Sequence, residues 1–198
     1  DRPEHGVIRL DGKPLKIKSP RDAIRQGICL LTEDRKTHGL VLGQTARENF
    51  GLPNLSQFAP LGFIRQREES LCFARYVDQI QIKITNPEQI TGTLSGGNQQ
   101  KIVLAKWLQR NAEVIIFDEP TRGIDVGAKY EIYQLINQLA ADGKAILMIS
   151  SELPEVLGMS DRILVMNEGR ITGEITDVPN TTQEDIMKLA ISRQPLAA

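Results

Sequence analysis

A Ser-Gly-Gly turn, followed closely by an apolar strand that ends in two carboxylates, is the feature that most limits how this chain can fold. The turn lies at residues 94–101, which read Leu-Ser-Gly-Gly-Asn-Gln-Gln-Lys. The strand lies at residues 114–120, which read Val-Ile-Ile-Phe-Asp-Glu-Pro. A glycine-rich turn that opens a helix, next to a short apolar strand, is typical of an α/β sheet.

Strand and helix patterns continue to alternate after this point, which predicts a largely parallel sheet. Strands are expected at 114–118, 145–150 and 163–166, and helices at 98–108, 126–141 and 152–158. The run 45–108 is mainly helical and interrupts the alternation. We therefore expect a partial core at 1–44, a helical subdomain at 45–108, the rest of the core at 109–176, and a C-terminal helix and tail at 177–198.

Local turn and cap signals place the remaining elements. An Asp-Gly turn at 11–12 predicts an antiparallel hairpin at the N-terminus, and a Thr-x-x-Glu capping box at 45–48 predicts a helix start. The other expected elements are a helix begun by Ser19-Pro20 and ended by Gly27, a strand at 28–32, a charged loop at 33–39, an irregular run at 51–62, a helix at 64–80 with an apolar stripe of Leu71, Ala74, Val77 and Ile80, and a final helix capped by Thr181 and Glu184.

Composition limits the function classes. The chain has 198 residues, 40% hydrophobic and 25% charged, and a net charge of −1. These values fit a globular domain and do not indicate a broad nucleic-acid or anionic-membrane surface. No apolar run is long enough to span a bilayer, and the first residues do not resemble a signal peptide. We expect Cys29 and Cys72 to be reduced core residues of a cytoplasmic protein.

The turn at Ser95, Gly96 and Gly97 is a candidate phosphate site. The two glycines let backbone N–H groups approach an anion without a Cβ in the way. The helix start adds unpaired donors and the positive end of its dipole, and the Ser95 hydroxyl can donate as well. The alternative is an ordinary loop with an N-cap, which a lone Ser-Gly-Gly would favour.

The two carboxylates at Asp118 and Glu119 are a candidate metal and catalytic pair. A parallel strand places them at the carboxyl edge of the sheet, where ligands bind in α/β folds. Asp118 would hold Mg²⁺, and Glu119 would orient and deprotonate an attacking water. The alternative, an acidic surface turn, poorly explains the four apolar residues that directly precede the pair.

These strings together resemble the second ATPase half of a tandem ATP-binding-cassette (ABC) protein of the ribose/galactose/xylose class of bacterial sugar importers. The matching runs are Thr-Glu-Asp-Arg-Lys at 32–36, Gly-Leu-Val-Leu-Gly at 39–43, the signature at 94–101, the Walker B region at 118–129 and Ser-Ser-Glu-Leu-Pro-Glu at 150–155. The resemblance implies a P-loop NTPase-like ABC core that uses ATP and Mg²⁺.

The resemblance also implies the partners and further site residues. The partners would be an N-terminal ATPase half or a second copy, an inner-membrane sugar permease and, indirectly, a periplasmic sugar-binding protein, with the chain on the cytoplasmic face of the membrane. Gln99 joins the nucleotide-binding group. Asp125 would end the loop that crosses the ATPase dimer interface, although Asp125 is equally suited to cap the next helix, and the two roles are compatible.

Three departures from a complete ABC site weaken this half. No Gly-x-x-x-x-Gly-Lys-[Ser/Thr] loop occurs in the sequence, so the chain is expected to begin just after that motif. Glu33, expected as a ligand of metal and nucleotide, stands where a Gln usually follows the strand, and Ser151, expected to contact nucleotide, stands where a His usually contacts the γ-phosphate. We therefore expect Ser95 and Gly97 to act in trans, on ATP held by another ATPase half. The alternative for residues 33–36 is a solvated charged loop.

Two rival functions remain open from the sequence. One is an ABC-type ATPase of nucleic-acid work, which usually carries a coiled-coil or basic insertion; neither is evident between Glu33 and Leu94. The other is a truncated remnant that does not hydrolyse ATP by itself. The transported sugar cannot be deduced from this chain.

Overall fold

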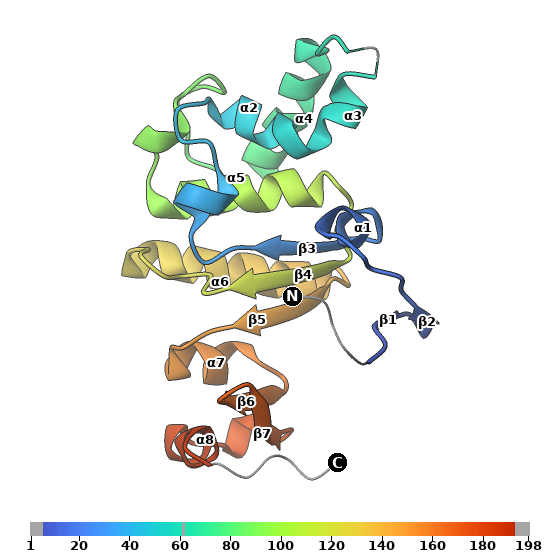
Figure 1. The fold of residues 1–198 in the computed structure, drawn as a ribbon. Coiled ribbons are helices and arrows are strands. Elements are labelled where there is room, and N and C mark those ends of the chain that lie inside the picture. Colours follow the sequence, from blue (N-terminus) through green and yellow to red (C-terminus); the bar gives the residue numbers. More distant parts are fainter. Residues whose placement is uncertain (1–5, 61, 193–198) are drawn as a thin grey trace. The chain divides into compact units, whose positions relative to one another are not determined.

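The computed structural model describes residues 6–60 and 62–192 of the chain. The chain divides into two compact units, residues 1–147 and 148–198. Helices and strands alternate along much of the first unit, and the second unit combines two helices with a two-stranded hairpin (Figure 1).

The first unit holds a hairpin, a short parallel sheet and a block of helices. Its elements are β1 (Arg9–Leu10), β2 (Lys13–Pro14), α1 (Pro20–Arg25), β3 (Ile28–Leu31), the π-helical turn Arg35–Gly39, α2 (Ala46–Gly51), α3 (Leu55–Phe58), α4 (Gln66–Gln79), α5 (Gly96–Leu108), β4 (Val114–Asp118) and α6 (Val126–Ala141). The strand β5 (Ala145–Ile149) begins in this unit and ends in the second. Short 3₁₀ turns lie at Leu52–Asn54 and Thr91–Thr93.

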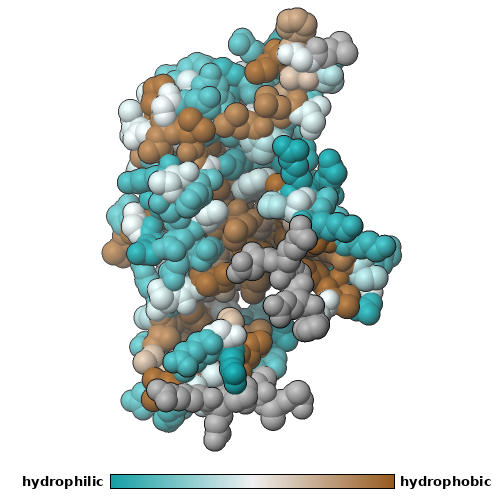
Figure 2. Space-filling view, viewed as in Figure 1, coloured by the Kyte–Doolittle hydropathy of each residue, from teal (hydrophilic) through white to brown (hydrophobic). Residues whose placement is uncertain are grey.

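The sheet has the strand order β3-β4-β5, and β3 pairs with β4 in parallel. One face of these two strands is buried, because Cys29, Leu31, Ile115 and Phe117 are at most 4% exposed. On the other face Leu30 is 44% exposed, and Figure 2 shows hydrophobic side chains in the region of the strands. The expected largely parallel α/β core is confirmed.

Most local signals also act as the sequence predicts. The Asp-Gly turn joins β1 and β2, and the Ser19 side chain caps α1. Thr45 and Glu48 form the reciprocal capping box of α2, and Asp125 caps α6. Both cysteines are free, and burial raises the pKa of Cys29 to about 12. Cys72 is only half-buried, so the core position expected for it is not confirmed.

Aromatic packing, rather than the expected aliphatic stripe, holds the helical block together. Phe50 of α2 lies 5.3 Å from Phe73 of α4 and 6.0 Å from Phe58 of α3, measured between ring centroids. Of the predicted stripe, Ile80 is confirmed, since it is only 5% exposed, whereas Leu71 is wrong, since it is 62% exposed. The fully buried Phe73, and not Leu71, packs against Phe50 of α2.

Two further predictions for this unit are wrong. The run 51–62, expected to be irregular, contains the 3₁₀ turn and α3. Residues 33–39, expected to be a charged loop, include the π-helical turn Arg35–Gly39, which begins where the Asp34 carboxylate accepts hydrogen bonds from the amides of Lys36 and Thr37. A carboxylate that caps its own following backbone builds such a turn without any apolar pattern.

The second unit packs α7 (Leu153–Met159) and α8 (Gln183–Ala190) with an antiparallel hairpin of β6 (Ile163–Asn167) and β7 (Arg170–Ile175). Its core is formed by Ile163, Val165, Val178 and Ile186. The cap of α8 is Thr182, with Asp185 as its partner, one residue later than predicted. Thr181 instead donates its hydroxyl to the Asp177 carbonyl.

Candidate functional site

Three candidate residues lie at or just after the strand ends at the carboxyl edge of the sheet. The parallel register pairs Leu31 of β3 with Phe117 of β4. Glu33 and Glu119 therefore lie at equivalent positions, two residues beyond this pair, and Asp118 is the last residue of β4. Asp118 and Glu119 are both half-buried. Among residues 6–60 and 62–192, no group of three or more His, Cys, Asp or Glu side chains is arranged to hold a metal ion, so the metal role expected for Asp118 stays a prediction.

Glu119 has a strained backbone. Its φ angle is +47°, in the left-handed region that residues other than glycine rarely adopt. Such strain persists where the surrounding structure fixes it, and it concentrates at functional sites. The left-handed backbone turns the chain sharply at the end of β4, and the role of Glu119 as a base stays a prediction.

The Ser-Gly-Gly turn forms the start of α5. Ser95 is exposed and caps the helix, and its Oγ lies 3.0 Å from Asn98 Nδ2. Gly97 is buried, and a Cβ there would come within 2.9 Å of the Ala128 Cβ on α6. Ser95 thus lies at the surface of the unit at the start of a 13-residue helix, while Gly97 packs against α6.

Gln99 is part of the support of this turn. Its side chain is buried, and its amide nitrogen donates to the Thr91 and Leu94 carbonyls, both at 3.2 Å. Its amide oxygen accepts from Arg35 Nε at 3.4 Å. The side chain therefore orients the backbone that precedes Ser95, and a direct contact between Gln99 and nucleotide stays a prediction.

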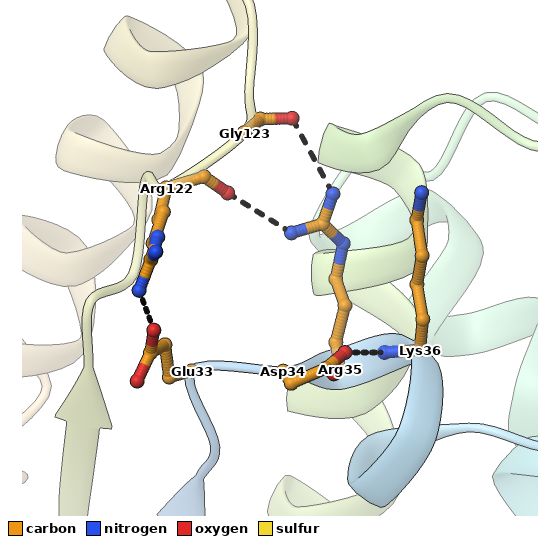
Figure 3. A pocket seen from close by; sticks show the side chains of 6 residues that line it. All are labelled: Glu33, Asp34, Arg35, Lys36, Arg122 and Gly123. Atoms are coloured by element: carbon orange, nitrogen blue, oxygen red, sulfur yellow. Dashed lines mark hydrogen bonds and ion pairs between the residues drawn. The ribbon is translucent and has the colours of Figure 1, made fainter.

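The segment after β3 and the loop after β4 meet at a pocket of about 290 Å³ (Figure 3). The pocket is lined by Glu33, Asp34, Arg35, Lys36, Arg122 and Gly123. Arg122 forms an ion pair with Glu33, so the carboxylate expected at the metal is held by a cation of the neighbouring loop. The hydrogen bond from Thr37 lowers the pKa of Asp34, which keeps the cap of the π-helical turn charged.

The remaining two candidates fall elsewhere. Asp125 caps α6 through its Oδ1, which accepts from the Ala128 amide at 3.0 Å, so the structural role expected for Asp125 is observed and its interface role stays a prediction. Ser151 belongs to the second unit, where it is exposed.

Sequence reasoning missed Arg35 and Arg122. Both stand in polar runs that match solvated loops, yet Arg35 is only 7% exposed and Arg122 pairs with Glu33. The available signal was chemical: an arginine between two carboxylates and a glycine, in a run that follows a buried strand. That signal indicates a structured turn but not the partners of the arginine.

The fold and the comparison with family models define the class of protein to which this chain belongs. The ABC transporter family model matches residues 1–122, so this chain belongs to the ABC transporter family.

Particular relatives are carbohydrate import proteins. The chain is 55% identical over 190 residues to a ribose/galactose/methyl galactoside import ATP-binding protein of Rhizobium etli, covering 96% of this chain and 36% of the relative. It is 54% identical to a ribose import ATP-binding protein of Clostridium perfringens and 52% identical to that of Bacillus subtilis, covering 94% and 96% of this chain and 37% and 38% of the relatives. The chain thus spans little more than a third of the length of these relatives.

Solved structures agree on the fold. An ATP-binding cassette of an ABC transporter superposes with a TM-score of 0.78 at 21% identity, covering 96% of this chain and 78% of the cassette. A dimeric ATP-binding cassette bound to ADP and phosphate superposes with a TM-score of 0.71 at 22% identity, covering 88% and 75%. Within the described residues, no helix combines the length and apolar composition needed to cross a bilayer.

Proposed function

We propose that this chain is the signature-bearing part of the second ATPase half of a sugar-import ABC protein. The observation that carries the proposal is the start of α5, where an exposed Ser95 precedes two glycines at the N-terminus of a 13-residue helix. Backbone amides and a hydroxyl in this arrangement bind phosphate oxygens. The Ser95–Gly97 turn would close on the γ-phosphate of ATP bound by a partner ATPase half.

Asp118, Glu119 and Glu33 would form the second, weaker site. One or two carboxylates are the protein ligands that Mg²⁺ needs when phosphates and waters complete its shell, so the half-buried Asp118 at the end of β4 fits this ion. Mg²⁺ would neutralise charge on the phosphates. Glu119 would accept a proton from water, and Glu33 would become a ligand only after leaving Arg122.

The assignment to a second half rests on two residues. Glu33 replaces an amide that can bind both metal and water, and Ser151 replaces an imidazole that reaches the γ-phosphate. By the resemblance to ABC ATPases, both changes would weaken the ATP site of this half, and neither lies at Ser95, Gly96 or Gly97. The chain would therefore contribute mainly in trans, and it would not hydrolyse ATP by itself.

The import role and its partners are proposed from the relatives. Their names describe ribose and galactose import ATP-binding proteins. By the same reasoning the chain would work at the cytoplasmic face of the membrane, with a sugar permease and, through it, a periplasmic sugar-binding protein. The net charge of −1 gives no support for a nucleic-acid partner.

A chimera tests the proposal directly. Residues 1–192 of this chain would replace the matching segment of the Bacillus subtilis ribose import ATP-binding protein, which is 52% identical. We expect a strain that depends on the chimera to take up ribose, and the same chimera with Ser95→Arg to lose uptake. A chimera that accumulates and binds its permease but transports with Ser95→Arg as well as without it would contradict the proposal.

A further inference from the structure

Arg35 is a buried cation that connects three segments far apart in the sequence. Its Nε donates to Gln99 Oε1 of α5 at 3.4 Å, and its Nη1 donates to the Arg122 carbonyl at 3.1 Å. Its Nη2 lies 3.5 Å from the Gly123 carbonyl. Figure 3 shows the guanidinium pointing from the π-helical turn into the loop after β4.

The chemistry of these contacts suits arginine alone. All three acceptors are neutral oxygens, and burial lowers the pKa of Arg35. A buried charge is costly unless its donors are used, and the planar guanidinium offers several donors in fixed directions. A lysine ammonium on a flexible stem could reach one of these oxygens, but it could not hold an amide of α5 and two loop carbonyls in one geometry.

The backbone makes room for this side chain at both ends. A Cβ at Gly96 would lie 2.5 Å from Arg35 Nη2 and 3.2 Å from the Gly123 carbonyl oxygen. A Cβ at Gly39 would lie 3.3 Å from the Arg35 Cβ. The first glycine of the signature turn is therefore needed for the path of Arg35, besides leaving the backbone open to phosphate.

A second buried cation, Lys106, also bonds the π-helical turn to α5. Lys106 Nζ donates to the Gly39 carbonyl and lies 5.5 Å from the centroid of the Trp107 ring. The π-helical turn is thus bonded to α5 near both of its ends. Of these two cations, Arg35 alone bonds the loop at Arg122 and Gly123, which makes Lys106 a matched control.

We propose that Arg35 is a positioning residue that makes the segment after β3, the signature turn and the loop after β4 move as one body. A displacement of residues 33–39 would then be transmitted to Ser95 through Gln99, and to Asp125 through the carbonyls of Arg122 and Gly123. The coupling itself does not depend on the proposed function, but the effect of the coupling on ATP turnover rests on it.

Hydrogen–deuterium exchange on the chain, resolved at single amides, measures this coupling. The probes are the Gln99 amide, bonded to the Ser95 carbonyl, and the Arg122 and Ile124 amides, bonded to the Glu119 and Thr121 carbonyls. For Arg35→Gln we expect exchange at these probes to rise by about tenfold or more, because local opening governs exchange. The Asn49 amide within α2, bonded to the Thr45 carbonyl, should not change.

Two further variants keep the test decisive. Lys106→Met should speed exchange of the His38 amide, bonded to the Asp34 carbonyl, and leave Arg122 and Ile124 unchanged. Arg35→Lys retains the charge, so it should fold even if Arg35→Gln does not, and it should still loosen Arg122 and Ile124. Unchanged exchange at these probes in both Arg35 variants would overturn the proposal. A rise that extends equally to Asn49 would also overturn it, because that pattern marks general loss of stability.

A kinetic measurement then separates this proposal from the proposed function. In an active chimera, Arg35→Lys should lower kcat for ATP several-fold with little change in KM, because coupling rather than nucleotide binding is lost. If the Arg35 variants change exchange in the chain as expected but the chimera is inactive, the proposed function is overturned and the coupling is still supported. Coupled exchange beside an unchanged kcat in an active chimera would overturn the transmission to Ser95.

Discussion

Replacing Arg47 by Met should remove a large part of the stability of the helical block that carries the signature helix. Arg47 of α2 forms an ion pair with Glu69 of α4, and their side chains are 10% and 3% exposed. Breaking a buried pair by removing one partner costs about 3–5 kcal/mol, because the other charge stays buried without compensation. Glu88, the second partner of Arg47, is 58% exposed, so losing that contact adds about 0.2–1 kcal/mol.

The loss should also depend on pH, with a defined sign. Burial raises the pKa of Glu69 already in the presence of Arg47, and without Arg47 the pKa rises further. A carboxyl group whose pKa is higher in the folded than in the unfolded state stabilises the fold below its unfolded pKa. That stability is lost as the pH rises through the folded pKa. The Arg47→Met variant should therefore lose more stability at pH 8 than at pH 5.

Urea unfolding followed by circular dichroism at these two pH values measures both effects. The matched control is Arg65→Met, which breaks an exposed pair with Glu68 and should change stability by less than about 0.5 kcal/mol. The double variant Arg47→Met/Glu69→Met should be more stable than Arg47→Met, because an apolar pair replaces an unpaired charge. A loss below about 1 kcal/mol for Arg47→Met, or strictly additive effects, would refute the reasoning.

Three more predictions concern the affinity for Mg-ATP and the titration of two side chains, Lys106 and Glu131. The 198-residue chain should bind Mg-ATP at least about a thousandfold more weakly than a complete site, since several charge-assisted hydrogen bonds of a phosphate loop are missing; micromolar affinity by calorimetry would contradict this. Burial lowers the pKa of Lys106 to about 8 from 10.5, so stability should rise between these pH values, and Lys106→Met should abolish that rise. Hydrogen bonds from Lys101 and Lys83 lower the pKa of Glu131 to about 2 from 4.5, so acid should weaken the contact between α5 and α6 over this range, and Glu131→Gln should lack that dependence in denaturation curves.

The sequence predicts those parts of the fold that local signals determine. The bounds of β4 and α6 are confirmed, because an apolar run ends at Asp118 and Asp125 caps a periodic helix. The helix stripe at Leu71 and the cap at Thr181 are wrong by small rotations or shifts, since tertiary packing of Phe73 and Ile186 decides them. The expected domain boundaries at 44, 108 and 176 stay predictions.

The candidate site divides in the same way. Ser95, Gly96, Asp118 and Glu119 stand in strings whose local chemistry is evident without any structure. Arg35 could not be recognised, because its carbonyl acceptors lie 87 and 88 positions further along the chain. Glu33 was expected to be free for a metal, and only the structure shows its ion pair with Arg122.

The central claim is that this chain acts mainly through its signature turn, and two variants of the chimera test that claim. Ser95→Arg suits this better than a Gly97 variant, because Ser95 is exposed while a side chain at Gly97 would meet Ala128. Ser95→Thr retains the hydroxyl and the cap as the control.

The measurement is the rate of ATP hydrolysis and of sugar uptake for Ser95→Arg beside Glu119→Gln. Loss of a single preorganised donor costs about 10²–10³ in rate, and an arginine side chain also blocks the phosphate, so Ser95→Arg should fall further than Glu119→Gln. If Glu119→Gln abolishes turnover while Ser95→Arg leaves it nearly intact, this chain holds the main catalytic site and the assigned roles are reversed.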